Sequence, residues 1–124
     1  MKKSLLVVAT FVSMQLTYAA DQPEADRPAP YQAVTGRYAI YSGDLDDQQA
    51  PTKKDRKLSL IIEGQAAKDL FDSMAPDDKT RCGSDGARSR TKGNTWCAYQ
   101  PKRGYKCYLG LDLRTGKSIA GGMC

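Results

Sequence analysis

The sequence predicts an α+β domain in which one amphipathic helix packs on a small antiparallel sheet of about four to five strands, linked by two disulfides. Three observations indicate this class. A single segment, residues 66–74, has apolar residues at helical spacing. Several short segments rich in branched and aromatic residues are separated by turns that contain glycine. The chain also has four cysteines, an even number that is typical of a disulfide framework in a small exported protein.

Residues 1–20 have the three-part order of a cleavable secretory signal. Lysines stand at positions 2 and 3, an apolar run follows over Leu5–Val12, and small residues close the segment at Ala19 and Ala20. The apolar run is shorter than the ~20 residues that a transmembrane anchor needs. We therefore expect cleavage after Ala19 or Ala20, no transmembrane anchor, and a location in the periplasm.

The remaining chain divides into a lead and a domain. Residues 21–30 contain three prolines and several charges without hydrophobic periodicity, which predicts a disordered, Pro-rich lead. Residues 31–124 are then a single small disulfide-bonded domain, since a chain of this length rarely forms two cores.

The first half of the domain contains two candidate strands and a loop. Arg37–Tyr41 is rich in aromatic and branched residues and ends at the turn signal Ser42–Gly43. Asp44–Lys57 is polar and contains Pro51, so it is predicted to be a surface loop. Leu58–Ile62 is a short, branched, apolar strand.

The predicted helix follows this strand. Its apolar positions are Ala66, Ala67, Leu70, Phe71 and Met74. Polar residues separate them, so the helix has one apolar face that can cover a sheet. Pro76 ends the helical pattern, because proline lacks an amide hydrogen and clashes with the preceding turn.

The second half is predicted to be antiparallel strands. Ala87–Thr91 and Thr95–Gln100 flank a turn that contains glycine, and Pro101–Gly104 reads as a four-residue turn. In the next segment, Tyr105–Leu113, alternation places five apolar side chains on one inward face. Lys117–Ala120 is a candidate final strand.

The cysteine pairing depends on where the hairpin turns. If Pro101–Gly104 is the turn, Cys97 and Cys107 point to opposite faces, which disfavours a disulfide between them unless a bulge shifts the register. Two pairings then remain. We favour Cys82–Cys97 with Cys107–Cys124, because its loops are nearly local, over Cys82–Cys107 with Cys97–Cys124.

Charge is unevenly distributed. Residues 21–80 contain 8 basic and 12 acidic residues, whereas residues 81–124 contain 9 basic and 2 acidic residues. The predicted binding surface consists of Arg81, Arg88, Arg90, Lys92, Lys102, Arg103, Lys106 and Tyr108. Such a cluster attracts polyanions, and arginine can fork onto phosphate or carboxylate. The alternative is an ordinary solvated face whose neighbouring aromatic residues belong to the core.

Several specific chemistries are disfavoured. Gly116–Ser118 resembles the end of a phosphate-binding loop but lacks the earlier glycine. Asp44, Asp46 and Asp55 have the spacing of a calcium loop, but Gln49 replaces its glycine. The chain has no histidine and no closely spaced cysteine pair, so we expect no metal site and no cofactor.

Catalysis is also unexpected. Without histidine the commonest general base is absent, and disulfide-bonded cysteines cannot act as nucleophiles. Paired carboxylates for glycan cleavage are the remaining enzymatic option. We predict that the protein is not an enzyme.

The YKC sequence at Tyr105–Cys107, the later glycines and the signal resemble small periplasmic lysozyme inhibitors. The resemblance implies a surface complementary to a basic lysozyme, which the acidic loop Asp44–Asp47 could provide, although residues 81–124 are basic. Our first hypothesis is a non-catalytic secreted or periplasmic binding protein whose basic surface holds an anionic envelope partner or a protein, but not nucleic acid. The alternative is an inhibitor or immunity-type factor acting on an envelope hydrolase.

Overall fold

The computed structural model describes residues 29–80 and 82–124, and the compact domain treated below is Gln32–Cys124. The predicted signal and most of the predicted lead lie outside the described residues. The elements are β1 (Thr35–Gly43), β2 (Gln48–Gln49), β3 (Lys57–Glu63), α1 (Gly64–Asp72), β4 (Arg88–Lys92), β5 (Thr95–Gln100), β6 (Gly104–Asp112) and β7 (Ser118–Ile119). The predicted α+β class with two disulfides is confirmed.

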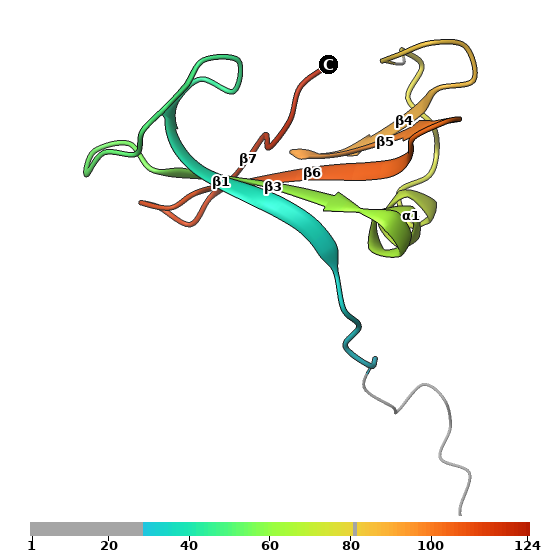
Figure 1. Ribbon diagram of the computed structural model, residues 1–124, viewed down its shortest axis with the longest axis horizontal. Helices are drawn as coiled ribbons and strands as arrows, with labels where there is room; N and C mark the ends of the chain where they lie inside the picture. Colours follow the sequence, from blue (N-terminus) through green and yellow to red (C-terminus); the bar gives the residue numbers. More distant parts are fainter. Residues whose placement is uncertain (1–28, 81) are drawn as a thin grey trace, which may run out of the picture. The chain divides into compact units, whose positions relative to one another are not determined.

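All strands form one antiparallel sheet (Figure 1). The strand order is β2-β1-β3-β6-β5-β4, and β7 pairs with the second half of β6. Seven strands exceed the four to five predicted. The additional short strand β2 lies inside the predicted surface loop, where its two residues pair with Ser42 and Gly43 at the end of β1.

Helix α1 covers one face of the sheet, which we call the helix face. It follows β3 without a loop, because Gly64 adopts a positive φ of 68° that turns the chain directly into the helix. Ala67 and Phe71 are fully buried against the sheet, and the Phe71 ring meets the Tyr105 ring edge-on at a centroid distance of 5.2 Å. The core of the domain therefore lies between α1 and the centre of the sheet.

The inward face predicted for Tyr105–Leu113 is covered only in part. Cys107 is fully buried, but Leu111 and Leu113 are 39% and 44% exposed. A helix of nine residues is about 13 Å long, whereas a strand of nine residues extends to about 30 Å. Helix α1 is thus too short to cover the second half of β6.

The C-terminal segment crosses the opposite face of the sheet, which we call the tail face (Figure 1). The Ser59 hydroxyl, on the tail face of β3, donates a buried hydrogen bond of 2.7 Å to the carbonyl of Gly121. A Cβ atom at Gly121 would lie 1.9 Å from the Leu109 carbonyl oxygen, so only glycine permits this close approach. Backbone thus packs directly on backbone on this face.

The disulfides are Cys97–Cys107 and Cys82–Cys124, so both predicted pairings are wrong. The error lies in the turn. Gln100 pairs with Gly104, not Tyr105, and Gly104 has the positive φ of 74° that this shorter turn requires. A shift of one residue moves a side chain to the other face of its strand, and it places Cys97 directly opposite Cys107.

Candidate anion-binding groove

The predicted basic surface is distributed over both faces of the sheet. Arg88 and Arg90 project from β4 on the helix face, since Arg90 is paired in register with Cys97. Lys106 and Tyr108 lie on the tail face of β6. Arg81 lies outside the described residues. These side chains therefore do not form the single surface that their sequence positions indicated.

Arg88 and Arg90 hold the connection between α1 and β4. Both donate to the Asp77 carboxylate, Arg88 at 2.8 and 3.0 Å and Arg90 at 2.7 Å. Arg90 also donates to the Phe71 carbonyl and stacks over the Phe71 ring at 4.3 Å. The hydrogen bonds from Arg88 and Arg90 lower the pKa of Asp77 to about 2. Both guanidinium groups thus already have hydrogen-bond partners within the domain.

The other predicted residues have different surroundings. Lys92 is exposed at the far end of β4, and Lys102 and Arg103 are exposed in the turn between β5 and β6. The Tyr108 ring stacks on Trp96 with a centroid distance of 4.7 Å and an interplanar angle of 20°. Of the predicted cations, Arg103 and Lys106 line a hollow in the surface.

That hollow is a groove of about 650 Å³ between the start of α1 and the β5–β6 turn. It is lined by Glu63, Gly64, Gln65, Lys68, Arg103, Gly104, Tyr105 and Lys106. Three different elements each contribute a cation: Lys68 comes from α1, Arg103 from the turn and Lys106 from β6. With Glu63 as the one carboxylate of the lining, the groove carries a net positive charge.

The three cations are not equally available. The Lys106 ammonium lies 3.2 Å from the Glu63 carboxylate, and Lys68 pairs with Asp72 one turn along α1. A hydrogen bond from the ammonium to Asp72 raises the pKa of Lys68. Arg103 makes no side-chain hydrogen bond or ion pair with any described residue. Its guanidinium therefore offers its full fork of donors to a ligand.

The start of α1 adds to the positive character of the groove. Glu63, the N-cap residue, makes no side-chain capping hydrogen bond, and the first turn contains no acidic residue. The first amides of a helix lack partners within the helix and carry partial positive charge. Since Gly64 and Gln65 line the groove, this end of the helix complements an anion there.

Lys68 and Gln65 were missed by the sequence reasoning. Both lie in the acidic half of the chain, where charge counting gave no signal. They reach the groove because β3 and β6 are neighbours, and Glu63 is paired in register with Lys106. Only this long-range pairing brings the start of α1 beside the β5–β6 turn.

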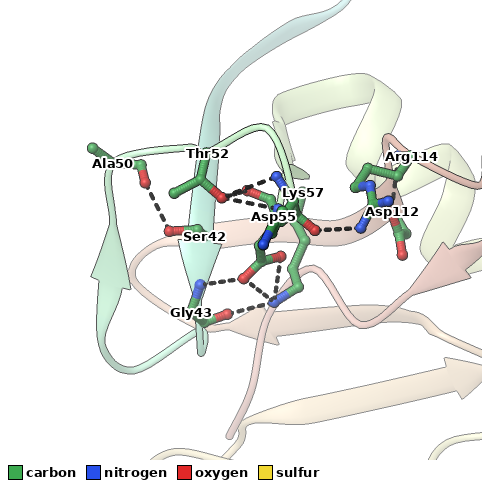
Figure 2. Close-up of polar contacts among 9 residues, drawn as sticks. Ser42, Gly43, Ala50, Thr52, Asp55, Lys57, Asp112 and Arg114 are labelled. Carbon is green, nitrogen blue, oxygen red and sulfur yellow. Dashed lines mark hydrogen bonds and ion pairs between the residues drawn. The ribbon is translucent and has the colours of Figure 1, made fainter.

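The opposite end of the sheet carries a polar network that fixes the loop between β1 and β3 (Figure 2). The Asp55 carboxylate accepts hydrogen bonds from the Gly43 amide at 2.8 Å and from the Lys57 ammonium at 3.2 Å. Lys57 also donates to the Gly43 carbonyl at 2.7 Å. These contacts, that of Gly43 first, lower the pKa of Asp55. Asp55 thus links the two ends of the loop by binding both Gly43 and Lys57.

A second contact joins this loop to the end of β6. Arg114 donates from its guanidinium to the Lys54 carbonyl, and its backbone amide donates to the Asp112 carboxylate at 2.9 Å (Figure 2). The acidic residues Asp44, Asp46 and Asp47 remain exposed on this anchored loop. The exposed carboxylates of Asp44, Asp46 and Asp47 therefore lie at one end of the sheet, and the basic groove lies at the other.

Among residues 29–80 and 82–124, no group of three or more acidic, histidine or cysteine side chains is arranged to hold a metal ion. Within the same residues, no helix is long and apolar enough to cross a membrane. No protein-family model matches the chain, and no curated protein or solved structure is significantly similar to it. Function is therefore inferred from the chemistry of the domain itself.

Proposed function

We propose that the protein is a non-catalytic binding protein of the cell envelope that holds an anionic group of an envelope component in the groove at the start of α1. The observation that supports this most directly is the convergence of Lys68, Arg103 and Lys106 from three elements on one hollow. A phosphate or carboxylate suits the planar fork of Arg103 and the point charges of the two lysines.

The proposed compartment determines which anions are available. The secretory signal predicted for residues 1–20 and the two disulfides are consistent with export to an oxidising space. The ligands that we propose are therefore the phosphates of lipopolysaccharide or the acidic groups of wall polymers. Association driven by such charges weakens as salt screens them.

A pair of charge-reversed variants tests this proposal. Lys102→Glu/Arg103→Glu alters the turn beside the groove, and Lys53→Glu/Lys54→Glu makes the same charge change in an exposed loop at the other end of the sheet. Binding is measured to zwitterionic vesicles with and without lipopolysaccharide, at about 50 and about 500 mM salt. We expect the first variant to lose at least about tenfold in affinity and the control to lose much less. Equal losses would contradict a localised site.

An inhibitor of an envelope hydrolase is the second candidate. It is favoured by the exposed acidic residues Asp44, Asp46 and Asp47, which the Asp55 network holds on a fixed loop. A preorganised acidic loop complements a basic enzyme such as lysozyme, because little loop entropy is lost on binding.

Affinity capture from an envelope extract separates the two candidates. If the groove is the binding site, the captured material elutes at high salt, and its capture requires the Arg103 side chain. A single hydrolase that is retained after the high-salt wash, and that is lost from an Asp44→Asn/Asp46→Asn variant, would favour the inhibitor. Mass spectrometry of the retained material identifies which outcome holds.

A further inference from the structure

A second hollow, of about 370 Å³, lies on the tail face between the β4–β5 hairpin and the C-terminal segment. Its lining includes Asp78, Thr91, Asn94, Trp96, Gly122 and Met123. This volume is in the range of small-molecule binding sites. We infer that this hollow binds a neutral saccharide, a ligand of a different class from the anion proposed for the groove.

An aromatic ring held in a fixed position forms part of the lining. Trp96 is half-buried, and one side of its indole is stacked on the Tyr108 ring at 4.7 Å. The backbone of Gly122 packs on the Tyr108 ring, because a Cβ atom there would lie 2.5 Å from the ring. The stack therefore has little freedom to rearrange. A rigid ring with an accessible side is suited to the C–H face of a pyranose.

Oriented acceptors lie near this ring. The Asp78 carboxylate receives one hydrogen bond on each oxygen, from the Thr91 amide at 3.1 Å and from the Thr91 hydroxyl at 2.7 Å. Each carboxylate oxygen retains a further lone pair. Asn94 donates through its amide nitrogen to the Ser118 carbonyl at 2.9 Å, which leaves its side-chain oxygen as an acceptor. Adjacent sugar hydroxyls can donate to such a set.

The charge of the hollow argues against an anion. Its lining among the described residues contains no lysine or arginine, and Asp78 contributes a negative charge. The Asp78 carboxylate would repel an anionic ligand, whereas uncharged hydroxyl groups can donate charge-assisted hydrogen bonds to it. The described linings of this hollow and of the groove thus differ in sign of charge as well as in position.

The wall formed by the C-terminal segment is held in place before any ligand arrives. The Cys82–Cys124 disulfide ties its end to the connection preceding β4, and the Ser59 hydroxyl bonds to Gly121 within the sheet. Binding therefore requires little ordering of the protein, which favours affinity for a small ligand.

Tryptophan fluorescence gives a direct test, because Trp96 is the only tryptophan of the chain. The full-length mature protein is titrated with tri-N-acetylchitotriose and, separately, with maltotriose. We expect a saturable change in emission with at least one of them, weakened about tenfold or more in Asp78→Ala. Arg103→Ala, in the other groove, is the matched control and should retain saccharide binding. The absence of a saturable change with either sugar, or an unchanged affinity in Asp78→Ala, would overturn the inference.

A second measurement avoids dependence on a variant, since Asp78 also contacts the edge of β4. Backbone and indole N–H signals of the unsubstituted protein are followed by NMR during the same titration. Shifts concentrated at Asn94, Trp96, Gly122 and Met123 would support the site. Shifts concentrated around Lys68 and Arg103, or none, would place the saccharide elsewhere and reject it. Because the two hollows share no lining residue, failure here leaves the anion-binding proposal unaffected.

Discussion

The two disulfides of this domain lie in contrasting environments. Cys97 and Cys107 are fully buried between the sheet and α1. The Cys107 sulfur lies 3.3 Å from the Ala67 carbonyl oxygen, and the Cys97 sulfur lies 3.6 Å from the Met74 Sδ atom. In the other pair Cys82 is half-buried and Cys124 is exposed. One disulfide is therefore part of the core, and the other ties two peripheral segments together.

A disulfide therefore stabilises this domain in two ways. Cys97 and Cys107 are 10 residues apart, and Cys82 and Cys124 are 42 residues apart. In the chain-entropy model these loops contribute about 3 and about 4 kcal/mol through the unfolded state. The buried pair also fills core volume, which the peripheral pair does not. Loop length alone predicts that Cys82–Cys124 stabilises the domain more. Because of its packing, Cys97–Cys107 should instead contribute more.

Replacing the buried pair is expected to have the largest effect. Cys97→Ala/Cys107→Ala removes the loop constraint and leaves a cavity beneath α1, so the free energy of unfolding should fall by about 5 kcal/mol. Urea unfolding followed by circular dichroism measures it. Loss of the cooperative transition agrees with this expectation. A loss smaller than that of the peripheral pair would show that loop length outweighs packing.

Replacing the peripheral pair should lower the free energy of unfolding by less than replacing the buried pair. Cys82→Ala/Cys124→Ala is expected to lower the free energy of unfolding by about 4 kcal/mol and to leave the helical signal unchanged. In the unsubstituted protein, brief treatment with a mild reductant should expose Cys82 and Cys124 first, because reduction requires access to sulfur. Mass spectrometry after alkylation identifies the labelled positions. Early labelling of Cys97 or Cys107 would show that the buried disulfide is not protected from the reductant.

A smaller effect is expected from the hydrogen bond beneath the C-terminal segment. Ser59→Ala leaves the buried Gly121 carbonyl without its partner and should cost about 1 to 2 kcal/mol. Because this bond and Cys82–Cys124 hold the same segment, combining the two changes should cost less than the sum of the separate losses. A double-mutant cycle by urea unfolding measures the coupling. Strict additivity would mean that the two attachments act independently.

The smallest effect concerns Asp77, in the connection that leads to Cys82. Its pKa is lowered from 3.8 to about 2, chiefly by the hydrogen bonds from Arg88 and Arg90. Folding therefore favours the ionised carboxylate, and this stabilisation is present above about pH 4 and lost as the pH falls towards 2. Asp77→Asn should lower the urea midpoint near neutral pH. The difference from the unsubstituted protein should shrink at about pH 2.5, and a constant difference would contradict this account.

Local patterns predicted the secondary structure well. The spacing of Ala67, Phe71 and Met74 indicated the helix and its buried side; Ala67 and Phe71 are buried on α1, and Met74 is buried just beyond its end at Asp72. Alternation likewise indicated β5 and most of β6. These features depend on residues a few positions apart, so the sequence displays them directly.

Long-range features were not predictable in the same way. The cysteine pairing was wrong because a turn shorter by one residue changes which face Cys107 occupies. The distribution of the basic residues was missed because Arg88 and Arg90 are engaged by Asp77, 11 and 13 positions earlier. Charge counting does not reveal which cations have partners in the fold.

The two long edges of the sheet are also unlike each other. Along β4, the Asp78 amide donates to the Ser89 carbonyl and the Asp78 carboxylate accepts from the Thr91 amide, so that edge is occupied. In the described part of the chain, the outer edge of β1 has a partner only at Ser42 and Gly43. If two copies paired through β1, neither would retain a long open edge for a third. Strand addition would then stop at a closed pair, which prevents growth into a fibre.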